Sequence, residues 1–394
     1  MRDAPATLAC IQPGSSSSPL RAAQRLWLAR ALAWALLLGG WLALGTLGRQ
    51  HLPGHAAGQG LVTLWLLSIG LTLALASRWH WRARPLQAAL LLLGVLAAVA
   101  MFCIGRSGLA LPLAALASGA LLVAASFTVR ALRPPRGRTA PSLVGPAVSG
   151  AVLAWALVGS LGATPYAAAR WGLALVAAAC LLASFLPRAA AAHGACRSGL
   201  FDCSSSLPMP AHWRRMADWP PAAAALGMLP MMASLPVMAD WCGAQSWSPA
   251  TASAAHLCAM LLPALVLRRA KSLRRPAAAI GLLLVLGGVA LWFPGASGLM
   301  AAALVHGVAW SVAWGEMLKA PRAGNALGAA PPSNLWAPWL ATAGFVLLLG
   351  VAVDRFGPPA LAAVHAVLAG LGGAGLAAIA LRHVWRASSA PSPA

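Results

Sequence analysis

Along this chain, apolar blocks of about twenty residues are separated by short polar segments. An amphipathic helix would instead alternate apolar and polar residues within each turn. The apolar blocks are rich in alanine, leucine and glycine, and short segments with arginine, proline and serine separate them. About 20 apolar residues in a helix cross a hydrocarbon core of about 30 Å. Backbone inside a lipid bilayer must satisfy its own hydrogen bonds, so each block is predicted to be helical. The pattern therefore predicts an all-α polytopic membrane protein.

About twelve such blocks can be drawn along the chain. They cover residues 26–48, 60–78, 86–105, 108–129, 143–163, 168–187, 221–240, 250–267, 276–294, 297–318, 336–353 and 359–381. The longest connection is residues 188–220, which we expect to be a central cytoplasmic loop. It separates an N-terminal six-helix bundle (21–187) from a C-terminal one (221–386). Residues 1–20 and 387–394 are expected to be disordered cytoplasmic tails.

The charged residues indicate how the chain is oriented in the membrane. The sequence has 28 Lys and Arg residues against 6 Asp and Glu, a net charge of +22. If the N-terminus is cytoplasmic, all of these basic residues but four fall on the cytoplasmic side; the exceptions are Arg49, Arg106, Arg170 and Arg355. Positive charge collects in cytoplasmic loops, so both termini are predicted to be cytoplasmic. This placement argues against nucleic acid as a partner.

The two predicted bundles share a basic loop after their second helix. Arg78, Arg82 and Arg84 follow the second block, and the cluster Arg268–Arg275 follows the eighth. Six plus six helices, a central cytoplasmic loop and these basic loops resemble the plan of the major facilitator superfamily. That resemblance implies a substrate site near the membrane midplane, between the two halves.

The seventh and eighth blocks hold the residues most suited to binding chemistry. Met228 and Met232 are four residues apart, as are His256 and Met260, so each pair shares one helix face. Thioethers and imidazole suit a soft metal such as Cu(I) and do not suit Mg²⁺ or Ca²⁺. Methionine is also an ordinary gap-filler in apolar cores. A histidine within a membrane span is costly, however, and is a functional candidate by default.

Residues 225–275 resemble the same region of the CcoA-like copper importers, a branch of the major facilitator superfamily. The matching residues are Met228, Met232, Pro236, Cys242, Gly243, His256, Met260 and Pro263. The resemblance implies that Met228, Met232, His256 and Met260 bind copper as a transported ion, with no permanently bound cofactor. It also implies import into the cytoplasm. The expected partners are the lipid bilayer, the copper ion, and a cytoplasmic copper acceptor or assembly factors of a haem–copper oxidase.

Further polar residues are candidates for an accessory role. Asp240 and Cys242 fall at the predicted outer mouth, and Cys258 and His306 fall inside apolar blocks. The 18 tryptophans are expected to lie mainly at the membrane interfaces.

No sequence motif of an enzyme is present. The chain lacks a Gly-x-Ser-x-Gly elbow and a Gly-x₄-Gly-Lys phosphate loop, so it is predicted to be a secondary transporter and not an enzyme. Copper import by alternating access is the leading hypothesis, and it implies that the membrane is a bacterial inner membrane. Two alternatives stay open: a facilitator-type exporter of an organic solute, and a transport-inactive relative that acts as an assembly or scaffold subunit.

The predicted topology can be tested with reporter fusions. Fusions after Pro135 and Arg215 are expected to report a cytoplasmic location, and a fusion after Pro53 the outer side, because of the charge distribution. Paired alkaline phosphatase and fluorescent-protein fusions in intact cells measure this. An outer location for residue 215 would contradict both the orientation and the two-bundle plan.

Overall fold

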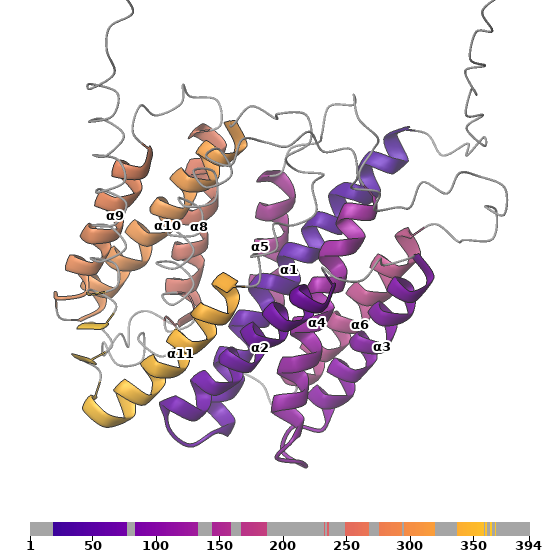
Figure 1. Ribbon diagram of the computed structural model, residues 1–394, viewed down its shortest axis with the longest axis horizontal. Coiled ribbons are helices and arrows are strands. Elements are labelled where there is room, and N and C mark those ends of the chain that lie inside the picture. The colour runs from indigo at the N-terminus through magenta and orange to yellow at the C-terminus, as the bar shows by residue number, and fades with distance from the viewer. Residues whose placement is uncertain are drawn as a thin grey trace, which may run out of the picture.

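The computed structural model is all-helical in the part of the chain that it describes, and it contains no strand there (Figure 1). The described residues are 19–76, 83–132, 144–158, 167–186, 232, 235, 249–267, 276–293, 295–319, 337–357, 359, 360, 363, 364 and 367. Their helices are α1 (Pro19–His51), α2 (His55–Ala76), α3 (Ala83–Phe102), α4 (Ala110–Ala131), α5 (Val144–Val158), α6 (Ala167–Phe185), α8 (Pro249–Leu267), α9 (Pro276–Ala290), α10 (Ala296–Lys319) and α11 (Ala337–Phe356).

Each of these helices overlaps one of the predicted apolar blocks. Five are long and apolar enough to cross a membrane, with spans at Ala23–Gly48, His55–Leu75, Arg84–Phe102, Ala110–Val129 and Ala168–Phe185, and four further helices contain shorter apolar stretches. The chain is therefore a multi-pass membrane protein. Most of the seventh and twelfth blocks, and the predicted central loop 188–220, lie outside the described residues.

The start of the first helix differs from the prediction. α1 begins at Pro19, seven residues before the first apolar block, and its opening turns are polar. Proline suits the first position of a helix because its missing N–H would have no partner there. The polar residues that follow favour helix well enough to extend it beyond the apolar segment. The helix thus begins two residues before residue 21, where the N-terminal bundle was expected to start, and residues 1–18 lie outside the described residues.

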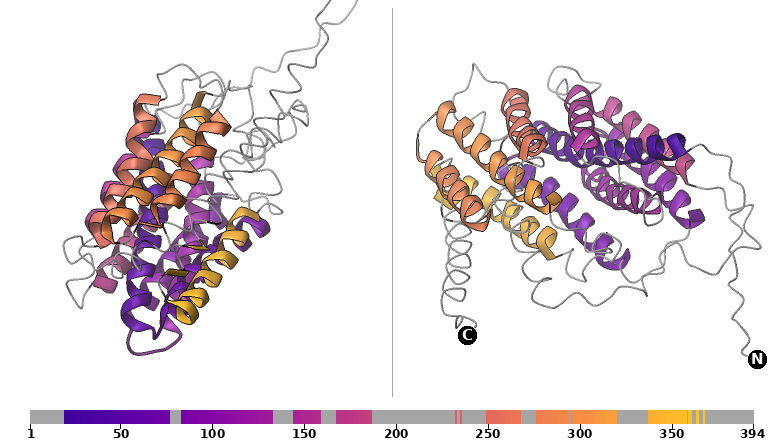
Figure 2. Two further views of the ribbon diagram at one scale, coloured as in Figure 1. Left: turned by 90° about the vertical axis from the view of Figure 1, so that its left-hand side faces the viewer. Right: turned by 90° about the horizontal axis from the view of Figure 1, so that it is seen from above.

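The helices form two groups that lie side by side (Figures 1 and 2). In the first group, α1 packs against α5, α4 and α2, and α3 packs against α6 and α4. In the second group, α10 lies between α8 and α9 and packs against both. Small residues allow these close approaches. A methyl group on Gly94 of α3, for example, would lie only 2.5 Å from the Cβ atom of Ala179 on α6.

By chain order α11 is the fifth helix of the predicted C-terminal bundle, and we count it with the second group. α2 packs along α11, and α5 packs against α8, so two contacts join the groups. The second helix of each predicted bundle thus meets the fifth helix of the other. We call the α2–α11 contact the seam. At its middle, the Thr63 hydroxyl donates a hydrogen bond to the Ala343 carbonyl over 3.3 Å.

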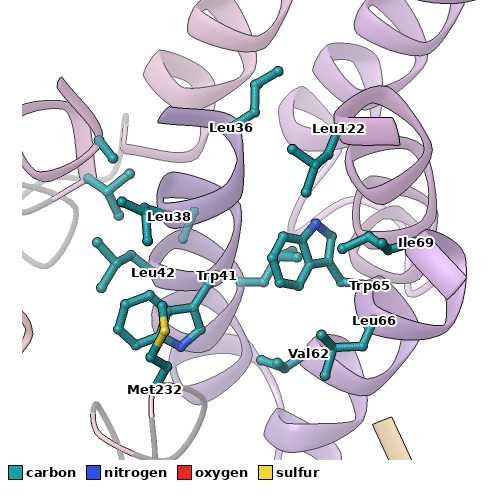
Figure 3. Close-up of a cluster of buried hydrophobic side chains, with 14 of the residues drawn as sticks. Leu36, Leu38, Trp41, Leu42, Val62, Trp65, Leu66, Ile69, Leu122 and Met232 are labelled. Carbon is teal, nitrogen blue, oxygen red and sulfur yellow. The ribbon is translucent and has the colours of Figure 1, made fainter. Parts of the chain in front are cut away.

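Three tryptophans are in the packed core of the first group. Trp41, Trp65 and Trp171 are each only 2% exposed. Figure 3 shows Trp41 of α1 and Trp65 of α2 among buried leucine, isoleucine and valine side chains. These three residues therefore pack between helices and do not face lipid. The adjacent glycines provide the space: Gly40 lies under the indole of Trp65, to which a methyl group would approach within 3.2 Å.

The packing of α5 on α1 depends on one glycine. A methyl group on Gly150 would lie 2.5 Å from the Ala31 carbonyl oxygen and 2.6 Å from the Trp34 Cβ atom. Gly150→Ala should therefore push the two helices apart and cost about 1–3 kcal/mol of unfolding free energy. The matched control is Gly60→Ala in α2, where no atom lies within 4 Å of the added methyl group. That control should gain roughly 0.5–1 kcal/mol, because alanine favours a helix over glycine. Unfolding midpoints in detergent measure both, and equal midpoints would contradict the packing argument.

Candidate functional site

His256 and Met260 occupy one buried face of α8. Their side chains are 0% and 1% exposed, whereas Cys258, between them in sequence, is exposed. The spacing of four residues places the imidazole and the thioether one helical turn apart on the same side. Cys258 points away from that side, so the structure does not bring it to the two candidate ligands.

A hydrogen bond to the neighbouring helix fixes the imidazole of His256. Its Nδ1 lies 2.6 Å from the carbonyl oxygen of Ala303 on α10. A carbonyl oxygen only accepts, so Nδ1 must carry the proton and donate it. The neutral ring then presents the lone pair of Nε2, which has no hydrogen-bond partner among the described residues. Histidines that bind metals commonly donate one ring N–H to such an anchor, which orients the other nitrogen as a ligand.

Gly307 of α10 lies against the backbone of α8 at the turn that carries both candidate ligands. A methyl group on Gly307 would lie 2.9 Å from the His256 carbonyl oxygen and 3.1 Å from the Met260 backbone nitrogen. It would also lie 2.8 Å from the Cβ atom of Ala259. α10 therefore contacts α8 directly at the turn that carries the pair. Ala303 fixes the His256 ring and Gly307 sets the distance between the helices.

Met232 lies at the boundary between the two helix groups. Its side chain is 3% exposed and belongs to the same buried apolar cluster as Met260. The same cluster contains Trp41 and Leu42 of α1, in the first group (Figure 3). Residues of α8, of the seventh block and of α1 thus contribute to one continuous core. Met228, Asp240 and Cys242 lie outside the described residues.

His306 is buried on a different flank of α10. It is 1% exposed, and its ring packs over Gly287 of α9, where a methyl group would lie 2.6 Å from Nε2. The Ala303–Gly307 edge faces α8 instead. In the described part of the chain no three His, Cys, Asp or Glu side chains are grouped as a metal site. The described candidate ligands there are one imidazole, at His256, and two thioethers, at Met232 and Met260.

Trp41 is a residue of this region that the sequence analysis did not single out. Its indole belongs to the same buried cluster as Met232, and no described atom accepts a hydrogen bond from its Nε1. Tryptophan has the strongest aromatic face for holding a cation. One signal was available in the sequence, because Trp41 stands well inside the first apolar block, whereas interfacial tryptophans are expected near the ends.

Comparison with known proteins identifies the fold. No protein-family model matches the chain, and no curated protein sequence matches it. Solved transporter structures do match. The peptide transporter POT in complex with sulfate has a TM-score of 0.60 and 17% identity, covering 94% of this chain and 96% of that one. A proton dependent oligopeptide (POT) family transporter has a TM-score of 0.59 and 14% identity, covering 90% and 99%. The nucleoside transporter NupG has a TM-score of 0.54 and 13% identity, covering 92% and 98%.

These solved structures are transporters by name, and the chain shares their fold. The all-helical fold of the described residues agrees with the all-α membrane protein expected from the sequence.

Gly307 provides a test of how α10 positions the candidate ligands. Gly307→Val should displace α8, because even one methyl group there meets backbone atoms at 2.9–3.1 Å. We expect unfolding free energy to fall by about 1–3 kcal/mol and the binding of silver ion, a stable analogue of Cu(I), to weaken. Gly344→Val in α11 is the control, since no atom lies within 4 Å of a methyl group there. Calorimetry in detergent measures silver binding, and equal affinity in both variants would contradict the positioning role.

Proposed function

We propose that this protein is a secondary transporter that imports copper by alternating access across a bacterial inner membrane. The observation that carries the proposal is the state of His256: a completely buried imidazole, anchored through Nδ1 to Ala303, whose Nε2 has no partner among the described residues, on the helix face that also carries Met260. A buried polar atom without a partner costs about 1–3 kcal/mol. An ion bound at Nε2 would offset that cost.

The ligand types select the class of ion. Imidazole nitrogen and thioether sulfur are neutral and comparatively soft, which favours Cu(I) over Mg²⁺ or Ca²⁺. Among the described residues, Met232 and Met260 belong to a cluster of buried apolar side chains, a setting that suits a monovalent ion better than a divalent one. A monovalent ion held by two thioethers and one imidazole would also be bound weakly enough to be released, as transport requires. Met228 is proposed as a further thioether ligand, one turn from Met232.

The position of Met232 supports a role in transport and not in storage. It lies against α1, so an ion held there would be touched by both helix groups. Major facilitator transporters bind their substrates at such a boundary and expose the site to each side in turn. We propose Asp240 and Cys242 as residues that attract the ion at the outer mouth, and His306 as an accessory residue. A cytoplasmic copper acceptor or oxidase assembly factors would receive the ion.

A transporter of an organic solute is the second candidate, and one specific observation favours it. The indole Nε1 atoms of Trp41, Trp65 and Trp171 are buried without a hydrogen-bond partner among the described residues. Indole N–H is a donor only, so these groups suit a solute that bears carbonyl or carboxylate oxygens. The solved neighbours named for peptides and nucleosides transport solutes of that kind.

Substitution of His256 separates the two candidates. His256→Asn keeps an N–H that can reach the Ala303 carbonyl but lacks the second nitrogen, so folding should be preserved. Radioactive copper uptake by cells should fall roughly tenfold or more if copper is the cargo, the loss typical when a metal site is disturbed. Met228→Leu and Met232→Leu keep apolar volume, so they should fold normally and lose uptake partially.

The control variant is Trp65→Phe, which removes a buried indole N–H far from the thioethers in sequence. It should leave copper uptake near the wild-type level. Wild-type uptake in a well-expressed His256→Asn/Met232→Leu double variant would overturn the copper proposal and favour the organic solute.

A further inference from the structure

The N-terminus of α2 has no capping residue in its own segment of the chain. The helix begins at His55, directly after Leu52, Pro53 and Gly54, and its first turn contains no acidic residue. The first backbone N–H groups of any helix lack intrahelical acceptors, and a serine, threonine, aspartate or asparagine just before the helix usually supplies one. Neither Leu52, Pro53 nor Gly54 has a side chain that can accept a hydrogen bond.

The missing cap comes from the opposite helix group. The carboxylate of Asp354, near the end of α11, accepts a hydrogen bond from the His55 N–H through Oδ1 and another from the Ala56 N–H through Oδ2, each over 2.8 Å. Both oxygens are used, and the negative charge lies at the positive end of the α2 dipole. The residues joined are 299 and 298 positions apart in the sequence.

Two glycines give the carboxylate access to the helix end. Gly54 has φ of +76°, a left-handed conformation that other residues rarely adopt, and a methyl group there would lie 3.2 Å from Oδ2 of Asp354. Gly350, one turn before Asp354, allows α11 to approach α2 so closely that a methyl group would lie 2.8 Å from the Ala56 Cα atom. The backbones of α2 and α11 are therefore in close contact at the end of the seam where the Asp354 carboxylate lies.

We propose that Asp354 is a gate residue that latches the two helix groups together at the face of the membrane where α2 begins. That face is the outer one in the topology predicted from charge. Transport by alternating access requires this face to open, and opening it would pull Asp354 away from α2. The local chain offers no replacement cap, so the latch favours the conformation that is closed there. The proposal concerns gating and holds for any cargo.

A buried cysteine in the seam reports on the latch. Thr63 is 6% exposed and bonded across the seam to Ala343, so Thr63→Cys should react slowly with a membrane-impermeant maleimide applied from the side of residue 54. Asp354→Asn keeps the shape but loses the charge, and should raise the labelling rate several-fold. Asp354→Leu removes both acceptors and should raise it further. The same variants without Thr63→Cys give the background from the native cysteines.

Arg355→Gln is the matched control, because it changes the charge by one unit at the same exposed helical turn. It should leave the labelling rate unchanged. Unchanged labelling in Asp354→Asn that is present in the membrane at normal levels would overturn the proposal, whatever the fate of the leucine variant. So would a lower unfolding midpoint without faster labelling, since that result describes a purely structural cap.

Discussion

Close approach of helix backbones is the constraint on which the rest of this structure depends. In a bilayer, each helix already satisfies its backbone hydrogen bonds. The lipid tails around it are as apolar as leucine, so burying leucine against another helix gives little hydrophobic gain. Helices then associate through direct packing, which works best where a small residue lets two backbones touch. Gly150 does this between α1 and α5, Gly307 between α8 and α10, and Gly350 between α2 and α11. The first contact builds a bundle, the second positions the candidate ligands, and the third closes the seam.

These close contacts also decide which polar side chains find hydrogen-bond partners on a neighbouring helix. The Ala303 carbonyl lies where α10 approaches α8, so one nitrogen of His256 is bonded and the other is not. Asp354 likewise finds two backbone donors because α11 approaches the start of α2. A buried nitrogen with no partner among the described residues is unfavourable by itself. Its position on the helix face of Met260 is the strongest argument for a bound ion there.

Parts of this arrangement were accessible from sequence, and the reasons for the rest are physical. The length of the apolar blocks predicts the helices because the bilayer sets that length, and the spacing of His256 and Met260 predicts their shared face because the helix sets that period. The start of α1 was missed because a helix can continue beyond the apolar segment. The burial of Trp41, Trp65 and Trp171 was not predicted, because it depends on which residues of neighbouring helices face them, such as Gly40 opposite Trp65. Asp354 was missed as a cap because its partners lie almost 300 residues away, although the absence of a local cap before His55 was visible.

The two parts of the candidate site respond differently to movement of the helix groups. His256 and Met260 are held by α10, which belongs to their own group, so the pair keeps its geometry whenever that group moves as a unit. Met232 shares a buried cluster with Trp41 of the first group, so its surroundings would change if the groups separated. An ion bound in this way would keep an imidazole and a thioether in every conformation, while its contacts at Met232 would depend on the conformation. Affinity that differs between conformations is what couples binding to a change of shape. The boundary contact at Met232, more than the anchored His256, is therefore where such coupling would arise.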